Sequence, residues 1–287
     1  ANPGILYYTL GNNPESVSDT GYLEVSNPNE PLIGGCVLDG RIFVWSDRQS
    51  WIILPSFNGG ASQGGSLFYP QLTAMGKGLA SPWAVCAGDK LYWVAWDGVW
   101  ASQGEAIASL TDESLSALFK HDGTYVEGAP FQGIYPIAFD TASAKWLSLT
   151  YSKDGLYLTF LGIDNNHYTM FYSFLTQGWV LDAYAGIATR FLREEGASVD
   201  TVLVGDVVGT LAVIDSASVS DQGSVIDCEL VTREEDWDDS RAQKQLGDQM
   251  IDVNCGGTAI TATLQVDNNS SQISLVTLNG SSREGLI

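Results

Sequence analysis

Short runs of apolar and aromatic residues alternate with turn residues along most of the chain. Residues 91–96 and 99–101 form two such runs around the dipeptide Asp97-Gly98. An Asp-Gly pair in this position favours a β-hairpin with a type I′ turn, which needs positive φ at both central residues. Successive side chains of a strand point to opposite faces, and here both sets are apolar. The sequence therefore predicts a hairpin that other parts of the protein cover on both faces.

Four segments repeat this arrangement of aromatic strands and turns. They are residues 37–56, 85–104, 148–182 and 199–215. Repeats at intervals of several tens of residues are typical of β-propellers, in which a four-stranded blade takes about 40 to 50 residues and lies between two neighbours. We therefore expect an all-β fold, a β-propeller built of four-stranded blades. A β-sandwich is the alternative, although its inner strands would alternate more clearly between apolar and polar side chains.

One segment favours a helix rather than a strand. In residues 111–119, Thr111 is suited to cap the first turn, and Leu115, Leu118 and Phe119 fall on one face at helical spacing. A helix this short depends on the packing of that apolar face for its stability. The sequence predicts one short helix here within an otherwise β fold.

The chain changes character towards its C-terminal end. We expect residues 1–227 to form the blades, because all four repeated segments lie there. Residues 234–239 carry the densest charge, and runs typical of strands follow at 250–254 and 260–266. Two alternatives stay open for residues 228–287, which form either a closing blade or the start of a second β-domain.

Composition limits the classes of protein to which this chain can belong. Hydrophobic residues make up 45% and aromatic residues 11% of the 287 residues, which excludes a disordered chain. No run approaches the ~20 apolar residues of a membrane span, and no basic segment followed by an apolar stretch opens the sequence. We expect a soluble protein with neither a membrane span nor a secretion signal.

Charge sets a second limit. The chain has 13 lysine and arginine residues against 34 aspartate and glutamate residues, so its formal net charge is −21. Affinity for nucleic acid depends on basic side chains that neutralise phosphates, and this surface would repel them. A carboxylate about 7 Å from a phosphate costs only about 0.6 kcal/mol in bulk water, so an acidic wall discourages DNA from adhering without blocking its passage. Solubility in salty surroundings explains the acidity equally well.

The cysteines and histidines do not form a recognisable site. Zinc sites usually need close cysteine pairs together with histidines, and the four cysteines lie far apart. We expect them to be buried, reduced thiols that pack as small hydrophobic groups. The two histidines lie beside turn residues, where solvated loop positions are expected. The residues concerned are Cys36, Cys86, Cys228, Cys255, His121 and His167.

Two acidic segments carry the oxygen ligands that a hard cation prefers. They are residues 234–239 and the run Asp164, Asn165 and Asn166, and neither has the spacing of a calcium-binding loop. We expect both to be solvated surface. Residues 59–65 are rich in glycine but lack the lysine and the strand-to-helix setting of a phosphate loop, and are expected to be a flexible insertion. We therefore expect no catalytic, cofactor-binding or metal-binding residue and no enzymatic activity.

Several stretches together resemble a known group of proteins. They are "PGILYYTLGNNPES", "NEPLIGGCVLDGRIFVWSDRQSWIIL", "GKGLASPWAVCAGDKLYWVAWDGVWASQGEAIASLTDESL" and "GWVLD". They resemble the β-propeller of bacteriophage tail hub or nozzle proteins, a group that includes the packaged-DNA stabilisation proteins of short-tailed phages. The features that carry the resemblance are Trp51 at the end of a strand, the Asp97-Gly98 hairpin, and the segment "SLTD" before a short helix. The resemblance extends from Pro3 to about Gly256.

The resemblance implies a structural virion protein, a hub, nozzle or head–tail connector that forms an oligomeric ring, commonly hexameric. Such a ring is set on the portal and adaptor, retains the packaged DNA, and lets it pass without specific binding. Its partners would be further copies of the chain and other tail, portal and adaptor proteins. Its place would be the virion, after assembly in the host cytoplasm. The family brings no catalytic or cofactor residues.

A different class of protein is the alternative. A β-propeller that binds or cleaves glycans, as an adhesin or hydrolase does, would stack tryptophans on sugar rings. Trp45, Trp100 and Trp179 are the candidates for that role, although packing in the core or at its edge is the expected role of all three.

Overall fold

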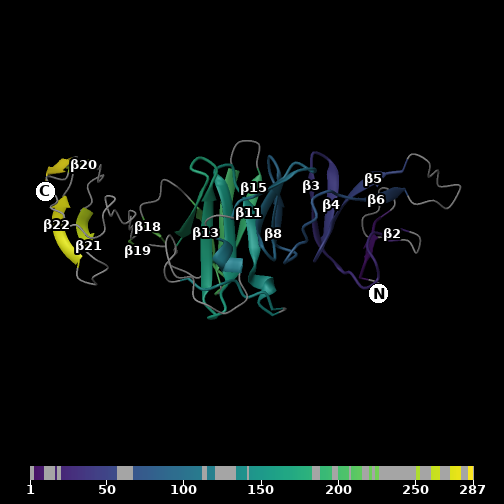
Figure 1. Ribbon diagram of the computed structural model, residues 1–287, viewed down its shortest axis with the longest axis horizontal. Helices are drawn as coiled ribbons and strands as arrows, with labels where there is room; N and C mark the ends of the chain where they lie inside the picture. The colour runs from purple at the N-terminus through teal and green to yellow at the C-terminus, as the bar shows by residue number, and fades with distance from the viewer. Residues whose placement is uncertain are drawn as a thin grey trace, which may run out of the picture. The chain divides into compact units, whose positions relative to one another are not determined.

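The computed structural model shows a chain made almost wholly of β-strands (Figure 1). It describes residues 3–9, 17, 21–56, 67–111, 115–119, 134–140, 142–182, 188–195, 200–206, 208–214, 220–221, 224–225, 250–252, 260–265, 272–278 and 284–286. The all-β class predicted from the sequence is confirmed. The chain divides into two compact units, Ala1–Asp227 and Cys228–Ile287. Whether the second unit is a closing blade or a separate domain stays a prediction.

Four sheets follow one another along the first unit, and each is an antiparallel meander whose strands lie in chain order. The first sheet contains β3 (Leu32–Leu38), β4 (Arg41–Ser46), β5 (Ser50–Pro55) and β6 (Phe68–Leu72). The second contains β7 (Val85–Ala87), β8 (Leu91–Ala95), β9 (Gly98–Ser102) and β10 (Ile107–Ser109). The third contains β11 (Ser148–Tyr151), β12 (Gly155–Leu161), β13 (His167–Ser173) and β14 (Gly178–Asp182). The fourth contains β15 (Ala188–Glu195), β16 (Asp200–Asp206) and β17 (Leu211–Ile214).

Smaller two-stranded sheets contain the other described strands. In the first unit, β1 (Ile5–Tyr7) pairs with β2 (Tyr22–Glu24), and β18 (Ser220–Asp221) pairs with β19 (Ser224–Val225). In the second unit, β20 (Met250–Asp252) pairs with β23 (Glu284–Leu286), and β21 (Ile260–Gln265) pairs with β22 (Gln272–Leu278). The four segments that repeat in the sequence each fall in a different one of the four large sheets.

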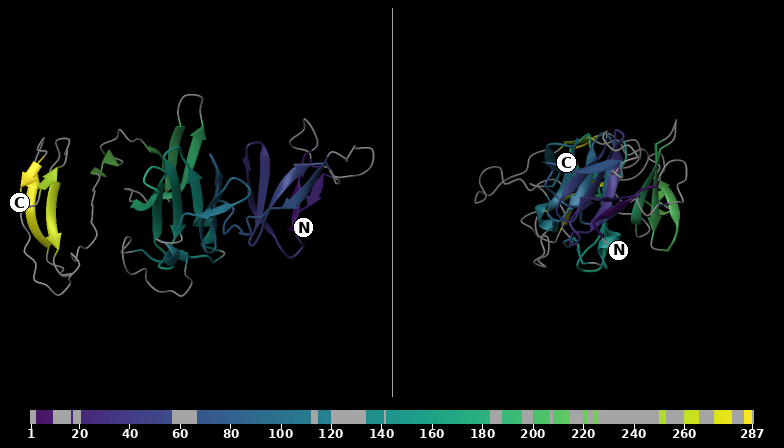
Figure 2. Two further views of the ribbon diagram at one scale, coloured as in Figure 1. Left: turned by 45° about the horizontal axis from the view of Figure 1, so that its top comes forward. Right: turned by 90° about the vertical axis from the view of Figure 1, so that its right-hand side faces the viewer.

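The large sheets pack face to face in the order of the chain. Their first strands lie next to one another, since β3 contacts β7, β7 contacts β11, and β11 contacts β15. Figures 1 and 2 show the first three of these sheets side by side. Over the residues that the structure describes, the sheets do not close into a ring.

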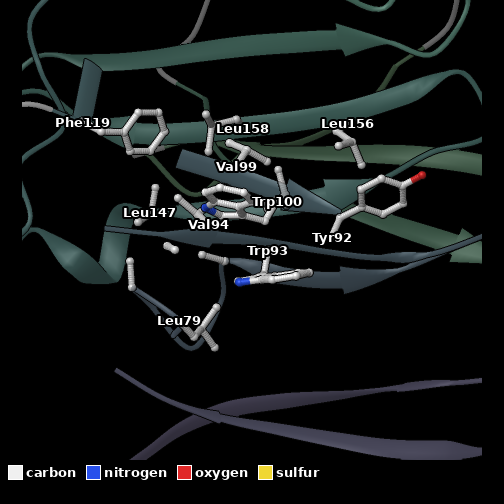
Figure 3. Packing of buried hydrophobic residues seen from close by; sticks show 14 of the residues in the cluster. Leu79, Tyr92, Trp93, Val94, Val99, Trp100, Phe119, Leu147, Leu156 and Leu158 are labelled. Atoms are coloured by element: carbon white, nitrogen blue, oxygen red, sulfur yellow. The ribbon is translucent and has the colours of Figure 1, made fainter. Parts of the chain in front are cut away.

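The second sheet lies between the first and the third and is covered on both faces. All five residues of β8 are buried. Trp93 faces the first sheet, where its ring centroid lies 5.9 Å from that of Trp45. Tyr92 faces the other way and stacks on Tyr151 of the third sheet at 5.9 Å, on the side where Leu156 lies in Figure 3. Burying each such ring contributes about 1.5 to 3 kcal/mol, so the prediction of a hairpin without a solvated face is confirmed for β8.

The turn of this hairpin differs from the prediction. Ala95 pairs with Gly98, so the two loop residues are Trp96 and Asp97, and neither has positive φ. The predicted type I′ turn at Asp97-Gly98 is therefore wrong. Gly98 is instead a strand residue beside Thr111, whose Oγ1 would lie 2.6 Å from a Cβ at position 98. This close approach, rather than the turn, accounts for the glycine.

A type I′ turn does form at another Asp-Gly pair. Asp39 and Gly40 connect β3 to β4 with φ values of 49° and 72°, and the flanking residues Leu38 and Arg41 pair directly. Positive φ at both central positions matches the twist of the two strands.

The predicted helix is shorter than expected and of a different type. A 3-10 helix, η1 (Ser116–Phe119), replaces the predicted helix over residues 111–119, of which residues 112–114 lie outside the described part. Leu115, Leu118 and Phe119 are buried, as their spacing predicted. The hydroxyl of Thr111 accepts a hydrogen bond from the Val99 N–H at 3.0 Å, so it is bound to β9. A second 3-10 helix, η2 (Ala144–Trp146), was not predicted.

The third and fourth sheets meet through a smaller apolar cluster. Phe191 of β15 stacks on Tyr157 of β12 with ring centroids 4.4 Å apart. The hydroxyl of Thr150 donates a hydrogen bond to the Phe191 carbonyl at 2.7 Å. Val202 and Val204 of β16 complete the buried part of this cluster.

The segment between the first and second sheets joins them through its backbone. The Leu79 N–H donates to the Ser46 carbonyl at 2.8 Å, and the Ala80 N–H donates to the Val94 carbonyl at 2.9 Å. Gly78 precedes these residues and lies directly on the backbone of Asp47. A Cβ at position 78 would overlap that backbone, so only glycine lets the segment pass.

Replacing this glycine should destabilise the packing of the two sheets. We expect Gly78→Ala to lower the free energy of unfolding by about 1–3 kcal/mol, because the new methyl group must push two backbone segments apart. Urea denaturation followed by tryptophan fluorescence measures this change. Gly178→Ala is the matched control, since its Cβ would lie 3.7 Å from the nearest atom, Thr176 Oγ1. Equal effects of the two substitutions would contradict the role of Gly78.

Candidate functional site

One polar hollow of about 600 Å³ lies at an end of the first sheet. It is formed by the loop between β2 and β3 and by the turn between β4 and β5. Asn27, Asn29 and Glu30 line it from the loop, and Asp47 and Arg48 line it from the turn, together with Pro28. Residues of both charges and two asparagines therefore line one open space.

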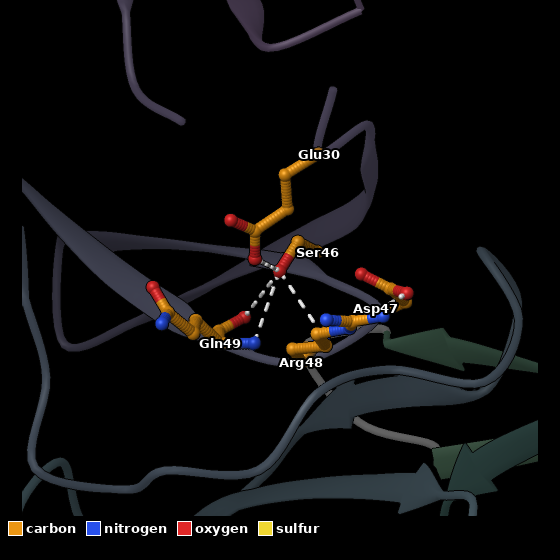
Figure 4. Close-up of polar contacts among 5 residues, drawn as sticks. All are labelled: Glu30, Ser46, Asp47, Arg48 and Gln49. Carbon is orange, nitrogen blue, oxygen red and sulfur yellow. Dashed lines mark hydrogen bonds and ion pairs between the residues drawn. The ribbon is translucent and has the colours of Figure 1, made fainter. Parts of the chain in front are cut away.

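The buried hydroxyl of Ser46 organises this hollow (Figure 4). It donates a hydrogen bond to the Glu30 carboxylate, which ties the loop to the turn. It also accepts the backbone N–H of Arg48 at 3.2 Å and that of Gln49 at 3.0 Å. All of these bonds fix the shape of the turn between β4 and β5.

The chemistry available in the hollow is limited. The Ser46 hydroxyl has a carboxylate partner but no histidine beside it, so the arrangement of a nucleophile with a general base is not present among these residues. The Arg48 guanidinium is largely exposed and lies 3.6 Å from the Asp47 carboxylate. An exposed ion pair of this kind contributes little to stability. We therefore interpret the hollow as the outer surface of a structural turn.

A second polar cluster joins the intersheet segment to the second sheet. Lys77 forms an ion pair with Asp97, whose other carboxylate oxygen accepts the indole N–H of Trp100 at 3.0 Å. The Lys77 ammonium also lies 4.3 Å above the centre of the Trp100 ring, a cation–π contact. Asp97 thus holds the segment that contains Gly78. The sequence predicted only a turn position for Asp97 and did not predict this contact.

The prediction for the two histidines can be compared with the structure at His167. His121 lies outside the described residues. His167 was expected in a solvated loop, but it is the first residue of β13, partly buried, and its ring lies edge-on to Trp146 at 5.0 Å. Burial lowers the pKa of His167. That expectation was wrong because the preceding turn is shorter than the run of polar residues suggested.

The Asp164 segment uses its carboxylate to close a turn. The side chain of Asp164 accepts hydrogen bonds from the Asn166 backbone at 3.2 Å and from the Tyr168 hydroxyl at 2.7 Å. Asn165 occupies the left-handed conformation between them, with φ of 63°. The other acidic segment, residues 234–239, lies outside the described residues, as does the glycine-rich run 59–65.

The three tryptophans considered for sugar stacking are all buried. Trp45 packs against Trp93 in the core. The indole N–H of Trp179 donates to the Leu110 carbonyl at 2.8 Å, and that of Trp100 is bound to Asp97. Their expected role in packing is confirmed, and none of them presents a ring face to solvent.

Two of the four cysteines can be placed. Cys36 of β3 and Cys86 of β7 are free thiols that pack against the main core, as predicted, but both are only partly buried rather than buried. Burial raises the pKa of Cys36 to about 12 from its ordinary value of 9.0. Burial also raises the pKa of Cys86, and the nearby Cys36 adds to the effect. Cys228 and Cys255 lie outside the described residues.

In the part of the chain that the structure describes, no group of three or more His, Cys, Asp or Glu side chains is arranged to hold a metal ion. In the same residues, no helix is long and apolar enough to cross a membrane. Comparison of the sequence with protein-family models and with curated proteins finds no match.

The buried thiols and phenols predict a loss of stability at high pH. Burial raises the pKa of Cys36, Tyr157 and Tyr168 to about 12 in the folded chain. The ordinary pKa is 9.0 for the cysteine and 10.0 for the tyrosines. Above those values the unfolded chain releases protons that the folded chain keeps, so the free energy of unfolding falls as pH rises. We expect the urea midpoint to decrease steadily between about pH 9 and pH 12.

A serine at position 36 provides the control for this measurement. Serine does not ionise in this range, so Cys36→Ser should make the decrease between about pH 9 and pH 10 shallower. A midpoint that stays constant or rises over the whole range would contradict the assignment of raised pKa values.

Proposed function

We propose that this chain is a structural protein of a bacteriophage tail, of the hub, nozzle or head–tail connector kind, which forms a ring that retains and conducts packaged DNA. The observation that supports this most is the serial face-to-face packing of meander sheets, with first strands side by side. Blades of a β-propeller pack in this way. The sequence resembles phage tail proteins that contain such propellers.

The finer proposal is that the four large sheets are blades. In a propeller, the first strand of each blade lies nearest the central axis and the last lies at the rim. Adjacent first strands β3, β7, β11 and β15 fit that arrangement. The remaining blades would come from residues outside the described part or from further copies of the chain.

The polar clusters also support a structural role. The bonds of Ser46 fix a turn, and the Lys77–Asp97 pair fixes the segment between two sheets. Among the described residues these clusters join elements of the fold rather than surround an open reaction centre. The proposed function therefore needs no catalytic residue.

Net charge supports the conduit. At −21 per copy, a ring lined by this surface repels phosphates instead of retaining them by contact. The three tryptophans named for the glycan alternative, Trp45, Trp100 and Trp179, are buried, so they do not support it.

Rings of the purified chain are the expected result of negative-stain electron microscopy and mass photometry over a concentration series. Copies that each carry a net charge of −21 repel one another. The distance over which this repulsion acts, the Debye length, falls from about 10 Å at 0.1 M salt to about 3 Å at 1 M. The fraction of chain in rings with a central hole should therefore be larger at the higher salt concentration. A monomer at every concentration and ionic strength would contradict the ring.

DNA should pass such a ring without being bound. We expect no retardation of labelled duplex DNA in a gel at about 0.05 M salt, where binding through phosphates is strongest. A basic DNA-binding protein run beside it shows that the assay detects binding. Retardation that weakens with added salt would mean that the ring carries a phosphate-binding surface, against the proposal.

A further inference from the structure

The fourth sheet has two faces of different character. Cross-strand pairing places Phe191 and Val204 in one row and Leu192, Leu203 and Val213 in the next. Neighbouring rows of a sheet point to opposite faces. Since Phe191 packs on the third sheet, the row of Leu192, Leu203 and Val213 points away from it.

The central row of this outward face is apolar and exposed, and Arg190 and Glu194 of β15 fall in the next rows on the same face. Leu192 is 52% exposed, Val213 is 57% exposed, and Leu211, on the same face, is 61% exposed. Each earlier large sheet is covered on the corresponding side by the next sheet along the chain. Among the large sheets that the structure describes, the fourth is therefore the last, and it presents the kind of surface that the others bury.

The first sheet leaves apolar residues uncovered at the opposite end of the series. Its face away from the second sheet carries Val44 and Trp51 in one row and Val37, Ile42 and Ile53 in another. The small sheet of β1 and β2 covers part of this face, with Leu6 and Leu23 packed in the same cluster as Val44, Trp51 and Ile53. Val37 remains 56% exposed and Ile42 38% exposed.

We infer that the outward face of the fourth sheet binds the outward face of the first sheet of a second copy of this chain. The inference deepens the proposed function and rests on it, because it names the contact that would build the ring. Face-to-face packing of these meanders already occurs three times within one chain, and the contact between copies continues it. The fourth-sheet face has an exposed apolar central row, and the first-sheet face leaves Val37 and Ile42 exposed beside the small sheet of β1 and β2. On a chain whose net charge is −21, copies can approach at these apolar residues with least repulsion.

A contact of this kind joins two different surfaces. It is heterologous, so each copy binds one neighbour through its fourth sheet and another through its first sheet. Repetition of the contact gives a closed ring or an open filament. A two-fold dimer would not leave both faces available for growth. The contact thus explains how one chain could form rings of many copies.

Blocking either face should stop assembly. Lysine placed in an apolar contact must lose its hydration without gaining a partner, so Val213→Lys and Val37→Lys should each weaken association at least about 100-fold and leave monomers. Leu175→Lys is the matched control, because Leu175 is 92% exposed in the turn between β13 and β14, on neither face. This variant should form rings as the unchanged chain does.

Mixing the two blocked variants gives the sharpest result. The Val213→Lys chain keeps an intact first-sheet face, and the Val37→Lys chain keeps an intact fourth-sheet face. An equimolar mixture should therefore form dimers of twice 30.8 kDa and nothing larger, as measured by mass photometry. A contact between two identical faces would instead give dimers of one variant by itself, and a contact through other parts of the chain would let each variant assemble without the other.

The outcomes separate this contact from the proposed ring. Rings of the unchanged chain together with rings of Val213→Lys would overturn the contact and leave the ring intact. Monomers of the unchanged chain at every concentration would overturn both, and would mean that the face is covered within one chain or by another protein. Circular dichroism checks that the variants fold. If they do not, hydrogen exchange of the unchanged chain decides, since β17 should be more protected in rings than after dilution.

Discussion

The rest of the structure depends on the packing of aromatic rings across the two faces of the second sheet. Trp93 contacts Trp45 on one side, and Tyr92 contacts Tyr151 on the other, so a single strand joins three sheets into one core. A strand with this pattern is stable in water only when both faces are covered, and the meanders before and after it provide the cover. The order of the sheets along the chain therefore becomes their order in space.

Polar contacts have a subordinate part in this arrangement. Ser46, Glu30 and the Lys77–Asp97 pair lie where the chain turns or passes between sheets, and each satisfies backbone or side-chain groups that the packing places there. Gly78 shows the same dependence, since the close approach to Asp47 is imposed by the sheets on either side. The candidate sites are thus consequences of the layered core, which agrees with the structural role proposed above.

The sequence predicted the features that depend on local pattern and missed those that depend on distant neighbours. The burial of both faces of β8 follows from its apolar side chains on both faces. The separate sheets of the four repeats follow from the turn residues between apolar runs. The turn at Asp97-Gly98 was misplaced because Gly98 is required by its close contact with Thr111, which is distant in the sequence and which no local rule describes. The helix was overestimated for the same reason, since the Thr111 hydroxyl is bound to Val99. The outward face of the fourth sheet could not be distinguished either, because an apolar strand has the same pattern whether or not another layer follows.

The layers of the first unit differ in how strongly they adhere. The second sheet shares a large aromatic core with both neighbours, whereas the fourth is held to the third mainly by Phe191, Val202 and Val204 and by one hydroxyl of β11. Local opening follows the weakest set of buried contacts, so under heat or mechanical load the fourth sheet would separate while the other three stay together. A load carried through this unit would accordingly be limited by its last layer, and anything that packs on that layer would raise the load at which it gives way.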